Sequence, residues 1–215
     1  MGRGVLYRGR WATPAEAPAH FPALRAPLPV PFMLPSGALN AYTVRAFNAT
    51  IFHMPQKSGV VHPRSFFYPL DIAADWHRGY GPRGFTQYQC VLPESGGYDA
   101  VRRFMEVVTR GGGASFLCVI KDCGAEGEGL LSFPKPGTSI ALDLAMRDDT
   151  QALVDQMNER VIAEGGRIYL AKDALTRPEH FRAMEPRLDR FLDVRRTWDP
   201  QGRLRSAQSL RLFGW

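Results

Sequence analysis

The segment between Phe85 and Ala171 constrains the fold more than any other part of the chain, because its apolar periodicity changes repeatedly between two and 3.6 residues. The run that begins at Phe85 alternates as a strand does. Helical spacing follows from Tyr98 to Val108 and returns from about Asp149 to Glu164. Further strands are predicted in "ASFLCVIKDC" (114–123) and "RIYLA" (167–171), and two more, joined by a Pro-Gly turn, in "LLSFPKPGTSIALDLAM" (130–146).

The predicted order is strand, helix, strand, strand, strand, helix, strand. This order is the ferredoxin-like split β-α-β plan with an added strand. We therefore predict an α+β fold, with a mainly antiparallel sheet and helices on one face. The opposite face of such a sheet is free of helices, so polar residues that point there are candidates for a site.

The segments on either side differ from this pattern. Residues 12–37 are rich in proline, which predicts an extended arm lying over a folded surface. "YTVRAFNATIF" (42–52) is rich in β-branched and aromatic residues and is predicted to be a strand. Near the C-terminus, "TRPE" (176–179) predicts a capping box at the start of a helix that runs through Met184. A second helix is expected in "PRLDRFLDVRRTW" (186–198), and the last residues have no strong pattern.

Composition excludes several classes of function. The formal net charge of +6 comes from scattered arginines, and no nucleic-acid-binding motif accompanies them, so no nucleic acid partner is expected. The three cysteines form no C-x-x-C pair and have no ligand spacing with the histidines, which predicts free thiols and no metal site. The N-terminus has no apolar signal-peptide core and no segment is apolar enough to span a bilayer, which predicts a cytoplasmic or peripherally membrane-associated protein.

Two glutamines are the first candidates for a site. Gln87 and Gln89 lie two residues apart in the predicted strand and therefore share one face. Each amide offers two donors and an acceptor, which suits the hydroxyl groups of a sugar or another polyol. An edge strand with one solvated face would carry such glutamines equally well, so both interpretations stay open at this point.

Two lysines are the second candidates. Lys121 and Lys172 follow apolar strand segments, where a cation meets an anionic ligand or a reduced cofactor ring. Lysines at strand ends also extend into water, and that interpretation is open as well. The sequence contains no G-x-G-x-x-G, G-x-S-x-G or Walker A motif, so no complete active site is visible.

Five segments resemble, in order and spacing, the C-terminal half of FAD-linked oxidases of the vanillyl-alcohol-oxidase type. "GYGPRGFTQYQ" and "YLAKD" are their most specific parts. Within this family the segments are most similar to decaprenylphosphoryl-ribose oxidases, with aldonolactone oxidases more distant. The resemblance covers nearly the whole chain from about residue 35, and the segments are "FFYPLDIAADWHRGYGPRGFTQYQCVLP", "SFLCVIKDCG", "LLSFPKPG", "GGRIYLAKD" and "FRAMEPRLDRFLDVRRTWDP".

The resemblance implies a domain organisation. Residues 1–40 would be the extended arm, residues 41–167 the substrate (cap) domain, and residues 168–215 a C-terminal segment that packs on a flavin domain. The FAD-binding N-terminal half of the family is expected to be absent from this sequence, so FAD would be bound mainly by a domain outside the chain. The implied partners are a flavin-binding domain or subunit and a downstream reductase.

The resemblance also assigns roles to particular residues. Lys172 would be catalytic and would contact the flavin together with Tyr169 and Ala171. Substrate-binding residues would be Gln87, Gln89, Lys121, Leu70, Phe67 and Ser139. Phe67 stands where the family has a pocket tyrosine, Ser139 where it has an asparagine, and Ala141 where it has a cysteine. These departures leave the particular substrate open.

The implied activity is an FAD-dependent oxidation of a secondary alcohol, by hydride transfer to flavin. The substrate would be a sugar or a polyprenyl-phosphate sugar of the kind that precedes cell-wall arabinan. Two alternatives stay open: part of an aldonolactone oxidase of the D-arabinono-1,4-lactone type, and a non-catalytic carbohydrate-binding module or inactive fragment.

Overall fold

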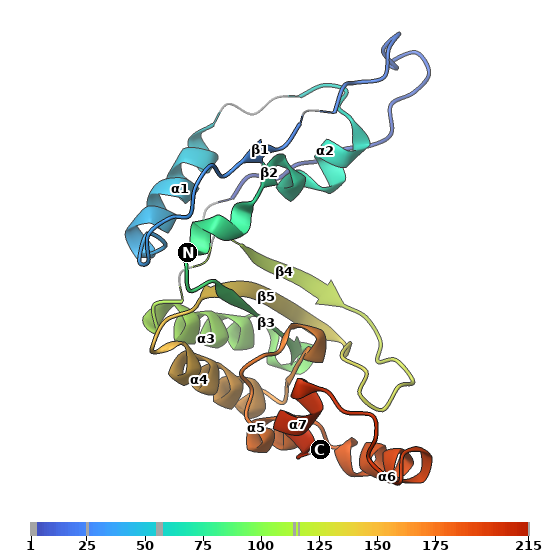
Figure 1. Cartoon of the computed structure of the whole chain (residues 1–215). Coiled ribbons are helices and arrows are strands. Elements are labelled where there is room, and N and C mark those ends of the chain that lie inside the picture. The colour runs from blue at the N-terminus through green and yellow to red at the C-terminus, as the bar shows by residue number, and fades with distance from the viewer. Residues whose placement is uncertain (1–3, 25, 55–57, 114, 116, 215) are drawn as a thin grey trace. The chain divides into compact units, whose positions relative to one another are not determined.

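The computed structural model of the chain describes residues 4–24, 26–54, 58–113, 115 and 117–214 (Figure 1). It divides into two compact units, Met1–Pro82 and Arg83–Trp215. Each unit is described by itself below. The second unit carries most of the buried apolar residues and most of the candidate site residues.

The second unit is built on a four-stranded antiparallel sheet in the order β4-β5-β3-β6. Its strands are β3 (Phe85–Pro93), β4 (Cys118–Cys123), β5 (Gly137–Ala145) and β6 (Arg167–Ile168). Helix α3 (Gly97–Arg110) follows β3 after a 3-10 turn, η3 (Glu94–Gly96), and helix α4 (Thr150–Ala163) follows β5. The predicted α+β fold with a ferredoxin-like split β-α-β sheet is therefore confirmed.

The prediction of two strands within residues 130–146 is wrong, because only the second half of that segment, β5, is a strand. Pro134 and Pro136 have no N–H to donate to a ladder. Gly137 then begins β5 at φ +151, and a Cβ built there would lie 2.0 Å from the carbonyl oxygen of Leu92. A glycine is required where the two central strands approach so closely.

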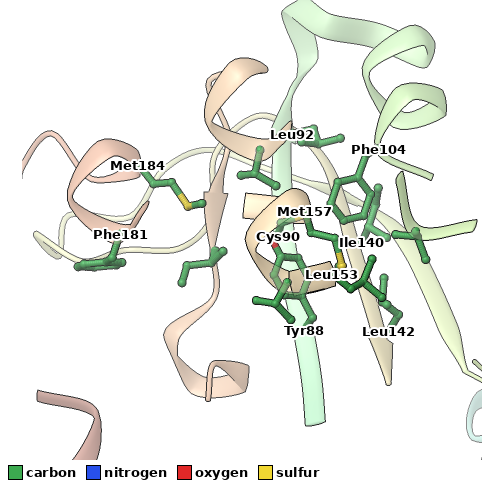
Figure 2. Packing of buried hydrophobic residues seen from close by; sticks show 14 of the residues in the cluster. Tyr88, Cys90, Leu92, Phe104, Ile140, Leu142, Leu153, Met157, Phe181 and Met184 are labelled. Atoms are coloured by element: carbon green, nitrogen blue, oxygen red, sulfur yellow. The ribbon is translucent and has the colours of Figure 1, made fainter. Parts of the chain in front are cut away.

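The two helices cover one face of the sheet, as predicted, and form the main core with it (Figure 1). Figure 2 shows Phe104 of α3 and Met157 of α4 packed against side chains of the central strands. Phe104 is fully buried and lies in a stacked arrangement with Tyr88. Burial of one such side chain stabilises the fold by about 1.5–3 kcal/mol. The core residues of the strands are Tyr88, Cys90, Leu92, Ile140, Leu142, Leu144 and Ile168.

Three helices at the C-terminus extend this core: α5 (Pro178–Met184), α6 (Leu188–Trp198) and α7 (Ala207–Phe213). The first two were predicted, and α7 was not. The predicted capping box at Thr176 is wrong, because α5 begins after Arg177 and has no side-chain cap. The Thr176 hydroxyl instead accepts a hydrogen bond from the buried amide of Asn158, at 3.1 Å.

Asn158 joins three parts of the second unit. Its side-chain oxygen accepts a hydrogen bond from the Tyr88 hydroxyl at 2.8 Å, and its amide group donates to Thr176. Asn158 and Thr176 are fully buried. Burial raises the pKa of the Tyr88 phenol well above its ordinary value, so the hydroxyl remains a donor at neutral pH. One amide thus links the sheet, α4 and the segment before α5.

The first unit has little regular structure. Strands β1 (Leu28–Pro29) and β2 (Ala73–Ala74) form a short parallel pair, and helices α1 (Ala41–His53) and α2 (Pro63–Phe67) lie between them in the chain. Two 3-10 turns complete it, η1 (Pro69–Ile72) and η2 (Trp76–Tyr80). Within the described part of residues 12–37, β1 is the only regular element, in keeping with a proline-rich extended segment.

The strand predicted for residues 42–52 is wrong, since this segment is helix α1. The side chain of Asn40 accepts hydrogen bonds from the N–H groups of Tyr42 and Thr43, and the Thr43 hydroxyl accepts one from the Asn40 N–H. This reciprocal capping box satisfies N–H groups that a helix otherwise leaves unpaired at its start. The cap therefore outweighs the β propensity of the residues that follow.

Many large apolar side chains of the first unit are exposed, among them Trp11 (74%) and Phe32 (63%), and helix α1 has no buried residue. Leu39 and Tyr80 are its buried apolar residues among those described. The described residues of the first unit therefore form no apolar core like that of the second unit.

None of the described helices of the chain is long and apolar enough to cross a membrane.

The role of Asn158 can be tested by substitution. Asn158→Ala removes the hydrogen bonds to Tyr88 and Thr176 and leaves these buried hydroxyls without this partner, so the free energy of unfolding should fall by about 3 kcal/mol. Gln156→Ala, which removes an exposed amide from the same helix, should change it by less than about 0.5 kcal/mol. Urea denaturation followed by circular dichroism measures both values, and equal effects would contradict the assigned role.

Candidate functional site

The candidate site lies on the face of the sheet that α3 and α4 do not cover. Gln87, Gln89 and Val91 alternate along β3 with the core residues Tyr88, Cys90 and Leu92, and therefore point to this face. In the register with β5, the same three positions lie opposite Asp143, Ala141 and Ser139. Residues directly opposite one another in an antiparallel pair share a face, so these six form one surface.

Both glutamines are hydrogen-bonded across the strands. The Gln87 amide donates to an Asp143 carboxylate oxygen at 2.9 Å, and the Gln89 amide donates to the Ser139 hydroxyl at 2.9 Å. Gln89 is 5% exposed and Ser139 is fully buried. Because β3 lies between β5 and β6, the interpretation of an edge strand with a solvated face is wrong. These amides are held in fixed orientations.

Lys121 lies on the edge strand β4, opposite Ser139 in the register, and therefore on the same face. Its side chain is exposed, and its ammonium group forms no hydrogen bond or ion pair with a described residue. An exposed position fits a ligand contact and a lysine that extends into water equally well. The structure places Lys121 in one row with Ser139 and Val91.

Tyr169, Ala171 and Lys172 lie at the other side of β3. Strand β6 pairs with β3, and directly after it the Tyr169 N–H donates to the Gln89 carbonyl oxygen at 2.8 Å. A 3-10 turn, η4 (Leu170–Lys172), follows. Ala171 is exposed and Lys172 is half-buried, and the part of the chain that the structure describes supplies no partner for the Lys172 ammonium. A half-buried cation without a partner is suited to an anionic group of a ligand.

Phe67 and Leu70 belong to the first unit, in α2 and η1, and they are 58% and 59% exposed. Their expected position beside the glutamines stays a prediction. The alignment of Gln87, Gln89, Ser139 and Lys121 on one face is a property of the second unit alone.

A residue that sequence reasoning missed is Phe133. Its ring lies 4.7 Å from the ring of Tyr169, centroid to centroid, with the planes tilted by 34°. Phe133 belongs to the segment 124–136 between β4 and β5, which we call the strap. The strap thus brings an aromatic side chain to the residue that follows β6. Its glycines and prolines gave no sequence signal for this contact.

A second group that was missed holds the strap. Arg167, opposite Val91 in the register and 7% exposed, pairs with Glu126 and donates to the Ser132 carbonyl oxygen at 2.8 Å. Arg187 donates to the same carbonyl at 3.0 Å and lies 2.9 Å from a Glu126 oxygen. The hydrogen bond from Arg167 lowers the pKa of the Glu126 carboxyl. Two arginines therefore clasp the strap at two points.

The sequence of the chain is similar to those of known proteins. The chain is 34% identical over 226 residues to decaprenylphosphoryl-β-D-ribose oxidase of Mycolicibacterium smegmatis. The alignment covers 99% of the chain and 48% of that protein. The chain is a relative of decaprenylphosphoryl-β-D-ribose oxidase. The family resemblance expected from the sequence motifs is confirmed.

A second relative is an uncharacterised protein from the mprA 5' region of Streptomyces coelicolor, 31% identical over 227 residues, or 98% of the chain and 61% of that protein. The chain spans about half the length of the M. smegmatis oxidase, which fits the expected correspondence to its C-terminal half. No protein-family model matches the chain.

Substitution of Glu126 tests whether Arg167 and Arg187 hold the strap in place. Glu126→Gln removes the charge that Arg167 and Arg187 clasp, and segments held by fewer contacts open more often. Cleavage after Glu128 by a glutamate-specific protease should become several-fold faster. The pKa of the Glu126 carboxyl is lowered in the folded state. Its contacts with the arginines therefore stabilise the strap at pH values above the unfolded pKa, and this stabilisation is lost as the pH falls through the folded pKa.

Glu159→Gln is the matched control, because Glu159 is exposed on α4 and forms no ion pair with a described residue. It should leave the cleavage rate after Glu128 unchanged. Equal rates in the Glu126→Gln variant and the unmodified protein would show that the clasp does not hold the strap.

Proposed function

We propose that this chain is the substrate-domain part of an FAD-dependent oxidoreductase that oxidises a secondary alcohol of a sugar or a polyprenyl-phosphate sugar. The observation that carries the proposal is the row of fixed amides on the helix-free face, Gln87 on Asp143 and Gln89 on Ser139, next to the turn that bears Lys172. The relationship to decaprenylphosphoryl-β-D-ribose oxidase supports it.

The polar row suits the hydroxyl groups of a sugar. Each glutamine uses one amide N–H within the sheet, and its carbonyl oxygen and second N–H can serve a ligand. Because both amides are already oriented, binding a hydroxyl group requires little further ordering of these side chains. Lys121, in the same row as Ser139, supplies a positive charge for an anionic part of the substrate such as a phosphate.

The residues beside β6 fit one edge of a flavin ring. Lys172 offers a cation without a partner among the described residues, and Tyr169 and Ala171 lie on the same short segment. Bound FAD would supply the acceptor for the hydride that leaves the carbinol carbon of the substrate. The role of Lys172 is to hold a positive charge beside the ring edge, where negative charge develops as the ring is reduced.

Among the described residues the fit covers only the ring edge. We therefore propose that a flavin-binding domain or subunit holds most of the cofactor and that the chain acts together with it. A downstream reductase is a further candidate partner. The departures at Phe67, Ser139 and Ala141 leave the sugar open within this substrate class.

The test is to co-express the chain with the FAD-binding part of the M. smegmatis oxidase that the chain does not match. The purified complex should carry flavin absorbance, which a polyprenyl-phosphate ribose should bleach under anaerobic conditions. Lys172→Met should slow this reduction about 100-fold, because removal of one group that stabilises developing charge has an effect of that order. Arg190→Met, which removes an exposed charge on α6, should leave the rate unchanged.

Each alternative function predicts a different outcome of this co-expression experiment. Bleaching by sugar lactones alone would indicate an aldonolactone oxidase. Binding of the sugar without flavin, weakened by Gln89→Ala and unaffected by Lys172→Met, would indicate a carbohydrate-binding module. Failure to obtain any flavin-bearing complex would contradict the proposed division of the enzyme.

We also propose that the first unit binds peripherally to anionic membranes. Residues 1–82 contain eight arginines and lysines and three acidic residues, a formal charge of +5 out of +6 for the chain. Aromatic residues such as Trp11 and Phe32 are exposed in this unit. Exposed aromatic and basic side chains together are typical of surfaces that bind the interface of a bilayer.

Vesicle sedimentation tests this association. The chain should sediment with vesicles that contain phosphatidylglycerol, and binding to pure phosphatidylcholine should be several-fold weaker. Phe32→Ser should reduce binding, whereas Val194→Ser, at an exposed apolar position of the second unit, should not. Binding that is independent of lipid charge and of salt concentration would contradict the proposal.

A further inference from the structure

We propose that helix α7 positions Lys172, and that Gln208 and Arg211 are the residues through which it acts. This inference rests on the proposed function of Lys172. Neither residue was a candidate from the sequence, because α7 is short and its segment has no strong pattern. Both lie far from Lys172 in the chain; Gln208 bonds to the turn that carries Lys172, and Arg211 bonds to the residues that follow it.

Gln208 holds the beginning and the end of this turn. Its amide group donates to the Leu170 carbonyl oxygen at 2.6 Å and to the Asp173 carbonyl oxygen at 3.3 Å. These two carbonyls flank Ala171 and Lys172. A single side chain therefore spans the η4 turn from one side to the other.

Arg211 holds the residues that follow the turn. Its guanidinium group donates to the Asp173 carboxylate at 2.7 Å and to the Asp173 carbonyl oxygen at 3.4 Å, and it also bonds to the Thr176 carbonyl oxygen. The Asp173 carboxylate in turn accepts a hydrogen bond from the Thr176 N–H at 3.0 Å. Hydrogen bonds between charged groups are stronger than those between neutral ones.

The turn has few other restraints. Strand β6 before it has two residues, and the bonds within the turn are Lys172 N–H to the Tyr169 carbonyl at 3.0 Å and Asp173 N–H to the Leu170 carbonyl at 3.3 Å. The Lys172 ammonium has no partner among the described residues that would hold the side chain itself. The backbone position held by α7 therefore sets the point from which this side chain extends.

Helix α7 is itself well anchored. Ser206 and Ser209 form a reciprocal capping box at its start, and Leu212 is buried. The ring of Phe213 lies 5.7 Å from that of Phe181 and 5.8 Å from that of Phe191, so α7 is fixed to α5 and α6. Gln208 and Arg211 are three residues apart and share one side of the helix. They reach the turn from a rigid support.

The first test uses the chain by itself. Gln208→Ala should increase amide hydrogen exchange at Lys172 and Asp173 about tenfold, because the variant lacks two hydrogen bonds that oppose local opening of the turn. The rate of acylation of Lys172 by a limiting reagent, measured by mass spectrometry, should change as well. Gln156→Ala is the matched control and should alter neither. Unchanged exchange at these amides in Gln208→Ala would overturn the proposal.

The second test uses the flavin-bearing complex. Gln208→Ala should lower kcat about tenfold and leave KM for the sugar nearly unchanged, since the sugar contacts lie on β3 and β5. Arg211→Lys keeps a charge for Asp173 and should retain more activity than Arg211→Gln, while Arg190→Gln should match the unmodified complex. An equal loss in the Lys and Gln variants, or a change confined to KM, would contradict a positioning role.

The two tests separate this inference from the proposed function. If Lys172→Met leaves flavin reduction unchanged, the proposed role of Lys172 fails, whatever the exchange experiment gives. If Lys172→Met abolishes reduction while Gln208→Ala alters neither kcat nor exchange, the role of Lys172 stands and the positioning role of α7 fails.

Discussion

The buried amide of Asn158 is the interaction on which the arrangement of the second unit depends. A fully buried amide is stable only when its polar atoms are bonded, and here they are bonded to Tyr88 of the central strand and to Thr176 before α5. The apolar core fills the space between helices and sheet without strong directional preference. The amide adds direction, because it fixes the distance between the sheet, α4 and the chain that leaves β6.

This network continues to the candidate site. Thr176 bonds to Asn158 through its hydroxyl, to Asp173 through its N–H and to Arg211 through its carbonyl. Asp173 directly follows Lys172, and the segment before it pairs with Gln89. A continuous series of hydrogen bonds therefore runs from the helix-covered face of the sheet, around β6, to the turn that bears Lys172. Core stability and site geometry depend on the same polar contacts.

Sequence reasoning succeeded where a pattern is local. The period-two alternation from Phe85 predicted which face carries Gln87 and Gln89, and the helical spacing predicted α3 and α4. It failed at α1, where one capping residue, Asn40, decides against the β propensity of the segment. It also missed the bonds of Gln89 to Ser139 and of Gln208 to Leu170, because each joins residues that are far apart in the chain.

The two faces of the sheet differ in how their side chains are stabilised. On the helix-covered face, apolar packing excludes water from around the hydrogen bonds of Asn158. On the other face, the polar groups of Gln87, Gln89, Ser139 and Asp143 are bonded to one another in pairs. Cross-strand pairs satisfy these buried groups within the sheet itself and hold the Gln87 and Gln89 amides in fixed orientations. Polar groups that are oriented before a ligand arrives need little further ordering when it binds, which is what the proposed binding of a sugar at a fixed distance from a flavin ring requires.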